Sequence, residues 1–404
     1  MNRHDSGRPS RLAAALSACV LLGASFVPAA LAGPTERNEA RRIHDRLAGV
    51  PPDDATLGLM EADIVAGDVR AAALRAMAHP EFYTTQLKNW VTPWTNVERS
   101  PYAPLNDYTA TVIGIVRDGR PFTDVLSADV VYVGANSLGV TPYSHDDNQH
   151  YIELEEGHID LSDPALLVPV AQSSLPGSQM QSSETAGVLT TRAAGEAFFS
   201  AGTNRRMWRY TAMNYLCRDM EQLSDITRPA DRVRQDVSRS PGGDSSVFLN
   251  TCVGCHAPMD AVAGAFAYFE WMPDPADPTR GRVVHTPGQV QNKYLQNENT
   301  FPFGYLTTDN RWDNYWREGD FSVLDWRGPA SGGWGAKSLG VEVASSAAFS
   351  QCQVEKVWKR VCFRDPANPA ERAEVSRIAT DVFEANAYDL REVFAAVAEY
   401  CMDD

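Results

Sequence analysis

Apolar residues recur at helical spacing near both ends of the chain. Residues 35–48 are predicted to form one helix, and two more follow, the second of them opened by Asp68. Three stretches near the C-terminus repeat this pattern, near 347–361, 368–386 and 388–401. The chain therefore has a helical N-terminal region, 33–200, and a helical C-terminal region, 341–404.

The middle of the chain mixes short periodic stretches with long segments that show no period. Residues 106–117 and 204–220 predict amphipathic helices, and residues 129–134 a brief strand. The segments 139–180 and 272–340 are rich in polar residues, Pro and Gly, and are predicted to be loops. The expected fold class is mainly α, with long irregular loops.

The N-terminus has the layout of a secretory signal. A basic start precedes the apolar residues 12–27, and Ala30 and Ala32 form a small-x-small cleavage site. We expect residues 1–32 to be removed as a signal peptide, which makes the protein periplasmic or secreted. The stretch ending at Cys19 also resembles a bacterial lipoprotein box, so a lipid anchor is the minor alternative. No later segment predicts a membrane span.

One short motif carries recognisable chemistry. Cys252-x-x-Cys255-His256 is the attachment signature of a c-type haem, whose vinyl groups bond to the two thiols. His256 then serves as the proximal iron ligand. A thioredoxin-like pair normally opens a helix after a strand, and a zinc site needs more ligands nearby. Neither pattern occurs here, so residues 201–340 are predicted to be a c-type cytochrome-like, haem-binding region.

The remaining cysteines predict disulfides. One of the seven cysteines lies in the signal peptide and the haem takes two, which leaves Cys217, Cys352, Cys362 and Cys401 in an oxidising compartment. If residues 347–361 form one helix, Cys352 and Cys362 lie about 15 Å apart along its axis. That separation is too large for a bond between them. Each must pair with Cys217 or Cys401, in an order that stays open.

Net charge limits the possible partners. The formal charge of the 404 residues is −16 at pH 7. So acidic a chain argues against nucleic acid or anionic lipid as the main partner. It suits steering toward a basic patch on a redox partner protein, although solubility alone explains it equally well. The sequence leaves the oligomeric state open.

Two further clusters have structural explanations that we favour. The segment from His145 to His158 contains the residue types of a cation site, but its spacing matches no known calcium loop or zinc helix. We interpret it as an acidic surface loop. A group of tryptophans could line a carbohydrate cleft or wall off a haem, and we favour packing. Its members are Trp312, Trp316, Trp326 and Trp334.

Several segments, taken in order, resemble the cytochrome-like domain proteins first recognised in planctomycetes. The chain departs from that pattern after Asp260, where Ala-Val-Ala-Gly-Ala stands in place of the family's Pro-Leu-Gly-Phe-Ala. A charged segment also replaces the family's proline-rich linker. The resemblance implies a secreted, α-rich monohaem protein and no defined reaction. The matching segments are 120–129, 187–190, 204–206, 252–260 and 349–364.

The sixth iron ligand is the open question. Met/His ligation suits electron transfer, whereas an open position permits small-molecule chemistry. We rank Met213 first as a tentative distal ligand. Met207, Met220 and Met272 are alternatives, and His285 is the imidazole candidate.

The leading functional hypothesis is a periplasmic cytochrome that transfers single electrons, because no catalytic set is recognisable. The alternatives are a peroxidase- or oxygenase-like haem enzyme with an open sixth position, or a secreted binding protein with an accessory haem. The size of the chain favours the enzyme over a simple carrier. A single Cys-x-x-Cys-His motif argues against a di-haem peroxidase.

Overall fold

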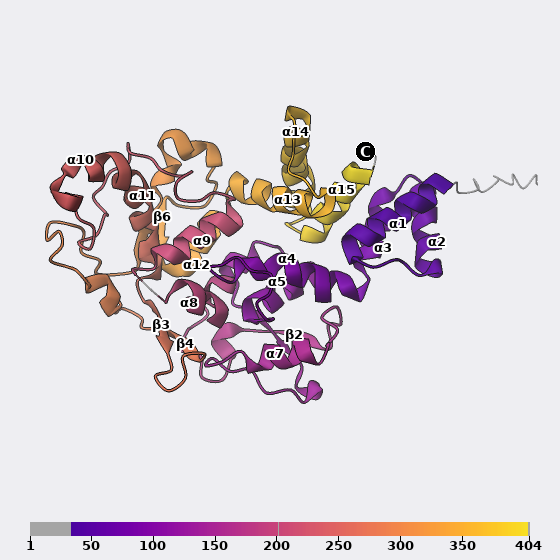
Figure 1. Ribbon diagram of the computed structural model, residues 1–404, viewed down its shortest axis with the longest axis horizontal. Helices are drawn as coiled ribbons and strands as arrows, with labels where there is room; N and C mark the ends of the chain where they lie inside the picture. The colour runs from indigo at the N-terminus through magenta and orange to yellow at the C-terminus, as the bar shows by residue number, and fades with distance from the viewer. Residues whose placement is uncertain (1–33, 201, 403–404) are drawn as a thin grey trace, which may run out of the picture. The chain divides into compact units, whose positions relative to one another are not determined.

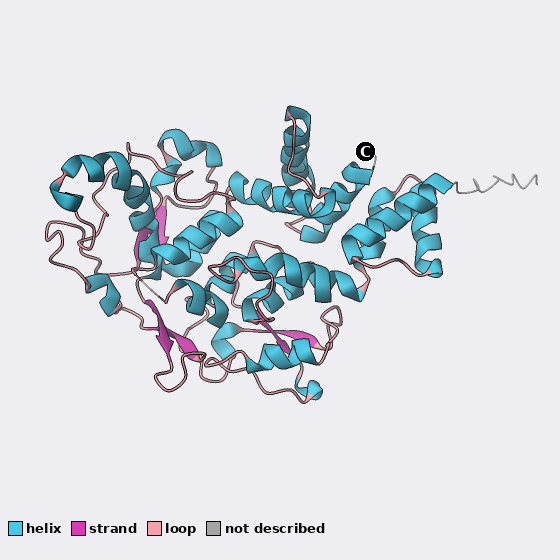
Figure 2. Ribbon diagram, viewed as in Figure 1, coloured by secondary structure: helices cyan, strands magenta, loops and turns pink. Residues whose placement is uncertain are grey.

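Helices dominate the chain, which a computed structural model describes over residues 34–200 and 202–402 (Figures 1 and 2). About 53% of the structure is helical and 8% is strand, so the mainly α class is confirmed. The signal peptide expected over 1–32, including Cys19, lies outside the described residues. No helix in the described part of the chain is both long and apolar enough to cross a bilayer.

The N-terminal helices follow the sequence pattern closely. They are α1 (Pro34–Ala48), α2 (Asp54–Val65) and α3 (Val69–Met77). Asp53 caps α2 by accepting the Thr56 N–H at 2.7 Å, and Asp68 caps α3 through Ala71 at 2.8 Å. A helical run then continues through the π-helix η1 (Phe82–Leu87), α4 (Lys88–Val91) and the 3₁₀ turn η2 (Thr92–Trp94).

The C-terminal helices pack against the N-terminal ones. The C-terminal elements are α13 (Ala347–Cys362), α14 (Pro369–Arg377), the π-helix η12 (Ile378–Glu384) and α15 (Leu390–Met402). Arg70 of α3 pairs with Glu392 of α15, and Arg42 of α1 donates to the Met402 carbonyl at 3.2 Å. The disulfides Cys217–Cys352 and Cys362–Cys401 bind α13 to the segment around Cys217 and to α15. The prediction that Cys352 and Cys362 do not bond to each other is confirmed. The structure also shows that Cys352 pairs with Cys217 and Cys362 with Cys401.

Helix α5 (Asp107–Arg117) corrects the prediction of an amphipathic helix, because all of its residues are buried. The Thr111 hydroxyl of this helix accepts the Tyr132 N–H at 3.1 Å inside the fold. Gly114 lies so close to the Tyr132 ring that a Cβ would collide with it. Helix α5 is therefore a central element that its neighbours cover on all sides.

The segment 139–180 is not the continuous loop that we predicted. It contains α7 (Gln149–Glu156) and β2 (Leu167–Val170), and β2 pairs antiparallel with β1 (Val131–Gly134), with Val131 opposite Val170. The pairing partner lies more than thirty residues away, so local periodicity could not reveal it.

The central helices lead to the Cys-x-x-Cys-His motif. They are α8 (Arg192–Phe198), α9 (Arg205–Tyr215), α10 (Ser245–Val247), the π-helix η7 (Phe248–Cys252) and α11 (Val253–Ala263). Helix α9 ends five residues before the predicted end at 220. Cys217, which follows, has a φ of 53° and carries the disulfide to Cys352, and both features redirect the chain there.

The chain leaves the helical conformation soon after the motif. A 3₁₀ turn, η8 (Gly264–Phe266), ends α11, and β3 (Phe269–Pro273) then forms a hairpin with β4 (Gly281–His285). Gly264 approaches the Arg311 carbonyl so closely that a Cβ would collide with it. This approach brings β5 (Arg311–Asp313), paired with β6 (Gly332–Trp334), against the end of α11.

The remaining elements are short, apart from α12 (Gly335–Ala344). The other α-helix is α6 (Asp124–Ser127). The 3₁₀ turns are η3 (Asn136–Leu138), η4 (Gln172–Ser174), η5 (Gly187–Thr190), η6 (Pro241–Gly243), η9 (Asn292–Leu295), η10 (Tyr315–Arg317) and η11 (Gly319–Leu324).

One hydrophobic core extends from Ala40 to Met402 and so includes residues from every region of the described chain. Trp312, Trp316 and Trp326 are buried in it, which confirms packing as their role. Trp334, by contrast, is exposed. A second, smaller cluster lies beside the Cys-x-x-Cys-His motif and consists of Val233, Phe248, Val253 and Ala257.

Candidate functional site

The Cys-x-x-Cys-His motif lies in one helical run, 245–263, made of α10, η7 and α11. Asp244 caps its start by accepting the Ser246 N–H at 2.8 Å. At about 100° per residue, Cys252, Cys255 and His256 share a face that spans about 100° of the helix. All three side chains are partly exposed, and His256 retains 25% of its side-chain exposure.

A proline in α11 helps to dock the neighbouring chain onto the motif. Pro258 has no N–H, so the carbonyl of Gly254 lacks its normal helical donor. That carbonyl accepts the Asp225 N–H at 2.9 Å instead. A Cβ on Gly254 would collide with the Ser224 hydroxyl, so a larger residue between the two cysteines would force the Ser224 side chain to move.

The cysteines of the described chain divide into two groups. Four of them form the two disulfides, and Cys252 and Cys255 are free. The Cys255 thiol lies 3.4 Å from the Met220 carbonyl, and burial raises its pKa. The two disulfides therefore lie outside the motif, and the thiols of Cys252 and Cys255 are free and partly exposed.

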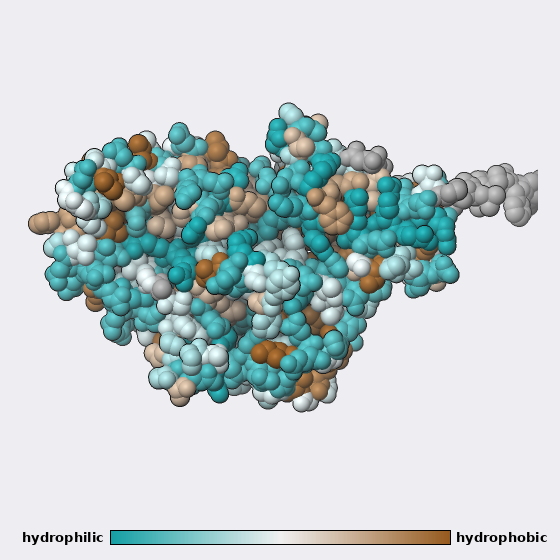
Figure 3. Space-filling model, viewed as in Figure 1, coloured by the Kyte–Doolittle hydropathy of each residue, from teal (hydrophilic) through white to brown (hydrophobic). Residues whose placement is uncertain are grey.

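Exposed apolar side chains lie beside the motif. Leu249 is 58% exposed and Ile226 is 64% exposed, and Ile226 approaches Gly254. Val247 is also exposed. Figure 3 shows brown, hydrophobic surface near α10 and α11 within a largely hydrophilic face. Adjacent exposed apolar side chains of this kind commonly mark a surface that a ligand or partner covers.

Beneath His256 lies a buried charge network. Its Nδ1 is 3.4 Å from Oδ1 of Asp260, one turn later on α11. The Asp260 side chain has no solvent exposure, and Arg205 binds both of its oxygens, at 2.5 and 2.8 Å. Burial alone would raise the pKa of Asp260, but Arg205 and Arg234 hold it well below its usual range. Asp260 is therefore a carboxylate.

These residues fit a covalent haem. Two free thiols and an imidazole share one helix face, and Nε2 of His256 makes no hydrogen bond to any described residue. Asp260 faces the other ring nitrogen, which is the usual arrangement behind a histidine that binds a metal. A zinc site fits less well, because the described residues contain no cluster of three His, Cys, Asp or Glu side chains that could hold an ion.

The predicted distal ligands occupy different surroundings. Met213 is half-buried on α9, and Met207 of the same helix is fully buried. Met220 lies beside Cys255 through its backbone, and Met272 is 54% exposed on β3. His285 is buried against Phe269, with its ring centroid 4.5 Å away. Distal ligation by Met213 stays a prediction.

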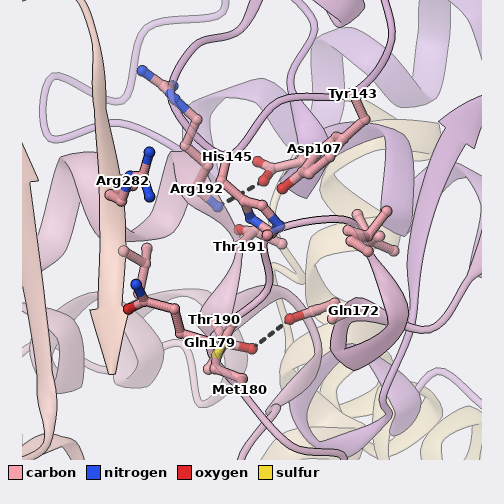
Figure 4. A pocket seen from close by; sticks show the side chains of 14 residues that line it. Asp107, Tyr143, His145, Gln172, Gln179, Met180, Thr190, Thr191, Arg192 and Arg282 are labelled. Carbon is pink, nitrogen blue, oxygen red and sulfur yellow. Dashed lines mark hydrogen bonds between the residues drawn. The ribbon is translucent and has the colours of Figure 1, made fainter. Parts of the chain in front are cut away.

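A pocket that none of the motif residues lines lies among α5, α8 and β4 (Figure 4). Asp107 is buried there and accepts the backbone N–H groups of Arg192 at 2.6 Å and Ala193 at 3.0 Å, so it caps α8. Figure 4 shows the Tyr143 hydroxyl directed at this carboxylate, with the His145 ring beside them. Burial lowers the pKa of His145, which keeps the ring neutral.

The carboxylates between His145 and His158 serve as attachments to neighbouring elements. Asp146 pairs with Arg282 of β4 at 2.5 Å, and Glu155 pairs with Lys88 of α4 at 2.6 Å. His150 uses both ring nitrogens within the fold, at 2.6 Å from the Thr141 carbonyl and 2.8 Å from the Gly134 N–H. Because these groups are already engaged, a structural role for the segment is favoured over cation binding.

The sequence located the thiols and the imidazole but missed the network behind them. Asp260 follows His256 by four residues on a helix, a spacing that places the two side chains on neighbouring turns. That spacing was the available signal. The contributions of Arg205, Arg234 and Asp236 come from distant segments and required the fold.

The chain matches no known family model, no curated protein and no solved structure. Its function is therefore inferred from the site alone.

Proposed function

We propose that this protein is an extracytoplasmic c-type cytochrome, of the planctomycete-type group that it resembles, and that it transfers single electrons. One haem would be bonded to Cys252 and Cys255, with His256 as the proximal ligand. One observation carries the proposal: the described cysteines outside the motif are paired in disulfides, while the two motif thiols are free beside an imidazole on one helix face. When bound, the haem supplies a one-electron iron couple.

The surroundings of the motif support a haem over a dithiol redox site. A thioredoxin-like cysteine has its thiol pKa lowered by a helix N-terminus or a nearby cation. Here burial raises the pKa of Cys255, and Asp219 and Glu221 act in the same direction. The exposed side chains of Leu249 and Ile226 would be covered by a porphyrin, which gives them an apolar contact that they otherwise lack.

Export is part of the same proposal. Covalent haem attachment and disulfide formation both belong to compartments outside the cytoplasm, and the two disulfides are consistent with such a location. The signal-like residues 1–32 would direct the chain there. A redox partner with a basic surface would suit the formal charge of −16.

The electron-transfer hypothesis is tested by absorption and magnetic resonance spectra of the holoprotein in both oxidation states. We expect six-coordinate, low-spin iron in each state and no binding of carbon monoxide to the ferrous form. Met213→Ala should open the sixth position and allow carbon monoxide to bind, whereas Met272→Ala, at an exposed position, should not. High-spin ferric iron in the wild type would contradict the electron carrier.

A haem enzyme is the second candidate, and the contact between His256 and Asp260 favours it. A carboxylate behind a proximal histidine makes the imidazole a stronger electron donor, which favours the oxidised states of iron. Such an enzyme would have an open sixth position, bind carbon monoxide when reduced and consume peroxide. Six-coordinate iron without peroxide turnover would rule out this alternative.

A further inference from the structure

Asp260 is the centre of a buried network that joins three segments of the chain. Its Oδ1 accepts from Arg205 Nε at 2.5 Å, and its Oδ2 accepts from Arg205 Nη2 at 2.8 Å. Its Oδ2 also accepts the Arg234 backbone N–H at 3.2 Å. Arg205 in turn holds Asp236 through two bonds, at 2.7 and 2.8 Å. Removing one partner of such a network leaves the other charges buried and unpaired.

The network determines which ring nitrogen of His256 carries a proton. An ionised carboxylate only accepts hydrogen bonds, so a ring nitrogen beside it must carry the proton. Nδ1 of His256 faces Asp260 at 3.4 Å, which assigns the proton to Nδ1 and the lone pair to Nε2. The contact is long because Oδ1 also serves Arg205. The arginines therefore fix the position of the Asp260 carboxylate and weaken the hydrogen bond that it accepts from the His256 ring.

We propose that Asp260 is a positioning residue for the proximal ligand: it fixes the Nδ1–H form of His256, presents Nε2 to the iron and lowers the reduction potential. This inference rests on the proposed haem site. A carboxylate that accepts the Nδ1 proton enriches the imidazole in electrons and so stabilises ferric iron. Because Arg205 and Arg234 partly neutralise Asp260, it should lower the reduction potential by less than an unpaired carboxylate would.

A matched pair of variants separates this role from simple stabilisation of the fold. Asp260→Asn removes the charge beside His256 and keeps the size of the side chain. Asp236→Asn removes a carboxylate from the same Arg205 network without touching His256. Both variants should lose stability, because each leaves an arginine less well paired. Only the Asp260 variant should change the electronic properties of the haem.

The measurement is the midpoint potential of each holoprotein by spectroelectrochemistry. We expect Asp260→Asn to shift the equilibrium toward ferrous iron by about tenfold, which is about 59 mV for one electron. Asp236→Asn should shift it clearly less. Equal shifts in the two variants, or no shift in Asp260→Asn, would overturn the inference while leaving the haem site intact. A wild-type chain without haem would overturn both.

A second measurement covers the case in which Asp260→Asn does not fold. In the wild-type holoprotein, nuclear magnetic resonance should find the His256 proton on Nδ1, exchanging slowly with solvent because it is bonded to Asp260. Fast exchange of this proton, or deprotonated Nδ1, would refute the positioning role without any variant.

Discussion

At the scale of single residues, buried histidines make the stability of the fold depend on pH. His150 is nearly inaccessible, donates from Nδ1 to the Thr141 carbonyl and accepts the Gly134 N–H at Nε2. A second ring proton would face that N–H, so only the neutral ring fits. Burial is the main reason that the pKa of His150 is lowered.

The lowered pKa of His150 determines whether stability rises or falls with pH. Below about 6.5 the unfolded chain binds a proton at His150 that the folded chain does not, so stability falls as the pH decreases from 7 to 5. We expect His150→Gln to remove part of this loss, as measured by urea unfolding at several pH values. His158→Asn, at an exposed position with a φ of 49°, is the control and should keep the wild-type slope.

At the residue scale, the sequence of the Cys-x-x-Cys-His motif predicts part of the candidate site. The two cysteines and the histidine of the motif lie within five residues of sequence, so the proposed haem attachment could be predicted without a structure. The Nδ1 partner of His256 could be suspected from the spacing to Asp260. The charge of that partner is set by Arg205 and Arg234, which only folding brings together.

At the scale of elements, close backbone approach sets the packing of α12. Gly340 of this helix lies against the carbonyl of Leu126 in α6, and a Cβ would collide with it. Gly340→Ala should therefore lower the free energy of unfolding by about 1–3 kcal/mol or more. Gly58→Ala in α2 is the matched control, because nothing lies near that position. It should raise stability by about 0.5–1 kcal/mol, as measured by denaturant titration.

The disulfides give a second prediction at this scale. Peptide mapping should find Cys217 bonded to Cys352 and Cys362 bonded to Cys401. Replacing both Cys362 and Cys401 with Ser should cost about 2–4 kcal/mol of stability in denaturant titrations. The crossed pairing, with Cys217 bonded to Cys362, would contradict the arrangement of α13.

Prediction of elements succeeded where their determinants were local. The helices at both ends follow from periodicity and from caps such as Asp53 and Asp68. It failed where a distant partner decided the structure. Strand β2 exists because β1 pairs with it, and α11 ends where Gly264 meets the chain at Arg311.

At the scale of the whole molecule, charge should control the rate of electron transfer. Because the 404-residue sequence is strongly acidic, with a formal charge of −16, the ferrous holoprotein should react with a cationic oxidant, such as tris(phenanthroline)cobalt(III), more slowly as salt is added. Ferricyanide, an anion, should show the opposite trend. The effect should be severalfold between about 0.01 M and 0.1 M ionic strength, where the Debye length falls from about 30 Å to about 10 Å. Stopped-flow absorption measures both rates, and identical salt trends would contradict electrostatic steering.

The central claim is that one haem is bonded covalently to the chain, and the mass of the whole protein tests it most directly. The full-length protein should be expressed in a host with c-type haem maturation, purified and measured intact under denaturing, reducing conditions. We expect the mass of the processed chain plus one haem, and a chain without haem when Cys252 and Cys255 are both replaced with Ser. A wild-type chain that carries no covalent haem under these conditions would contradict the account.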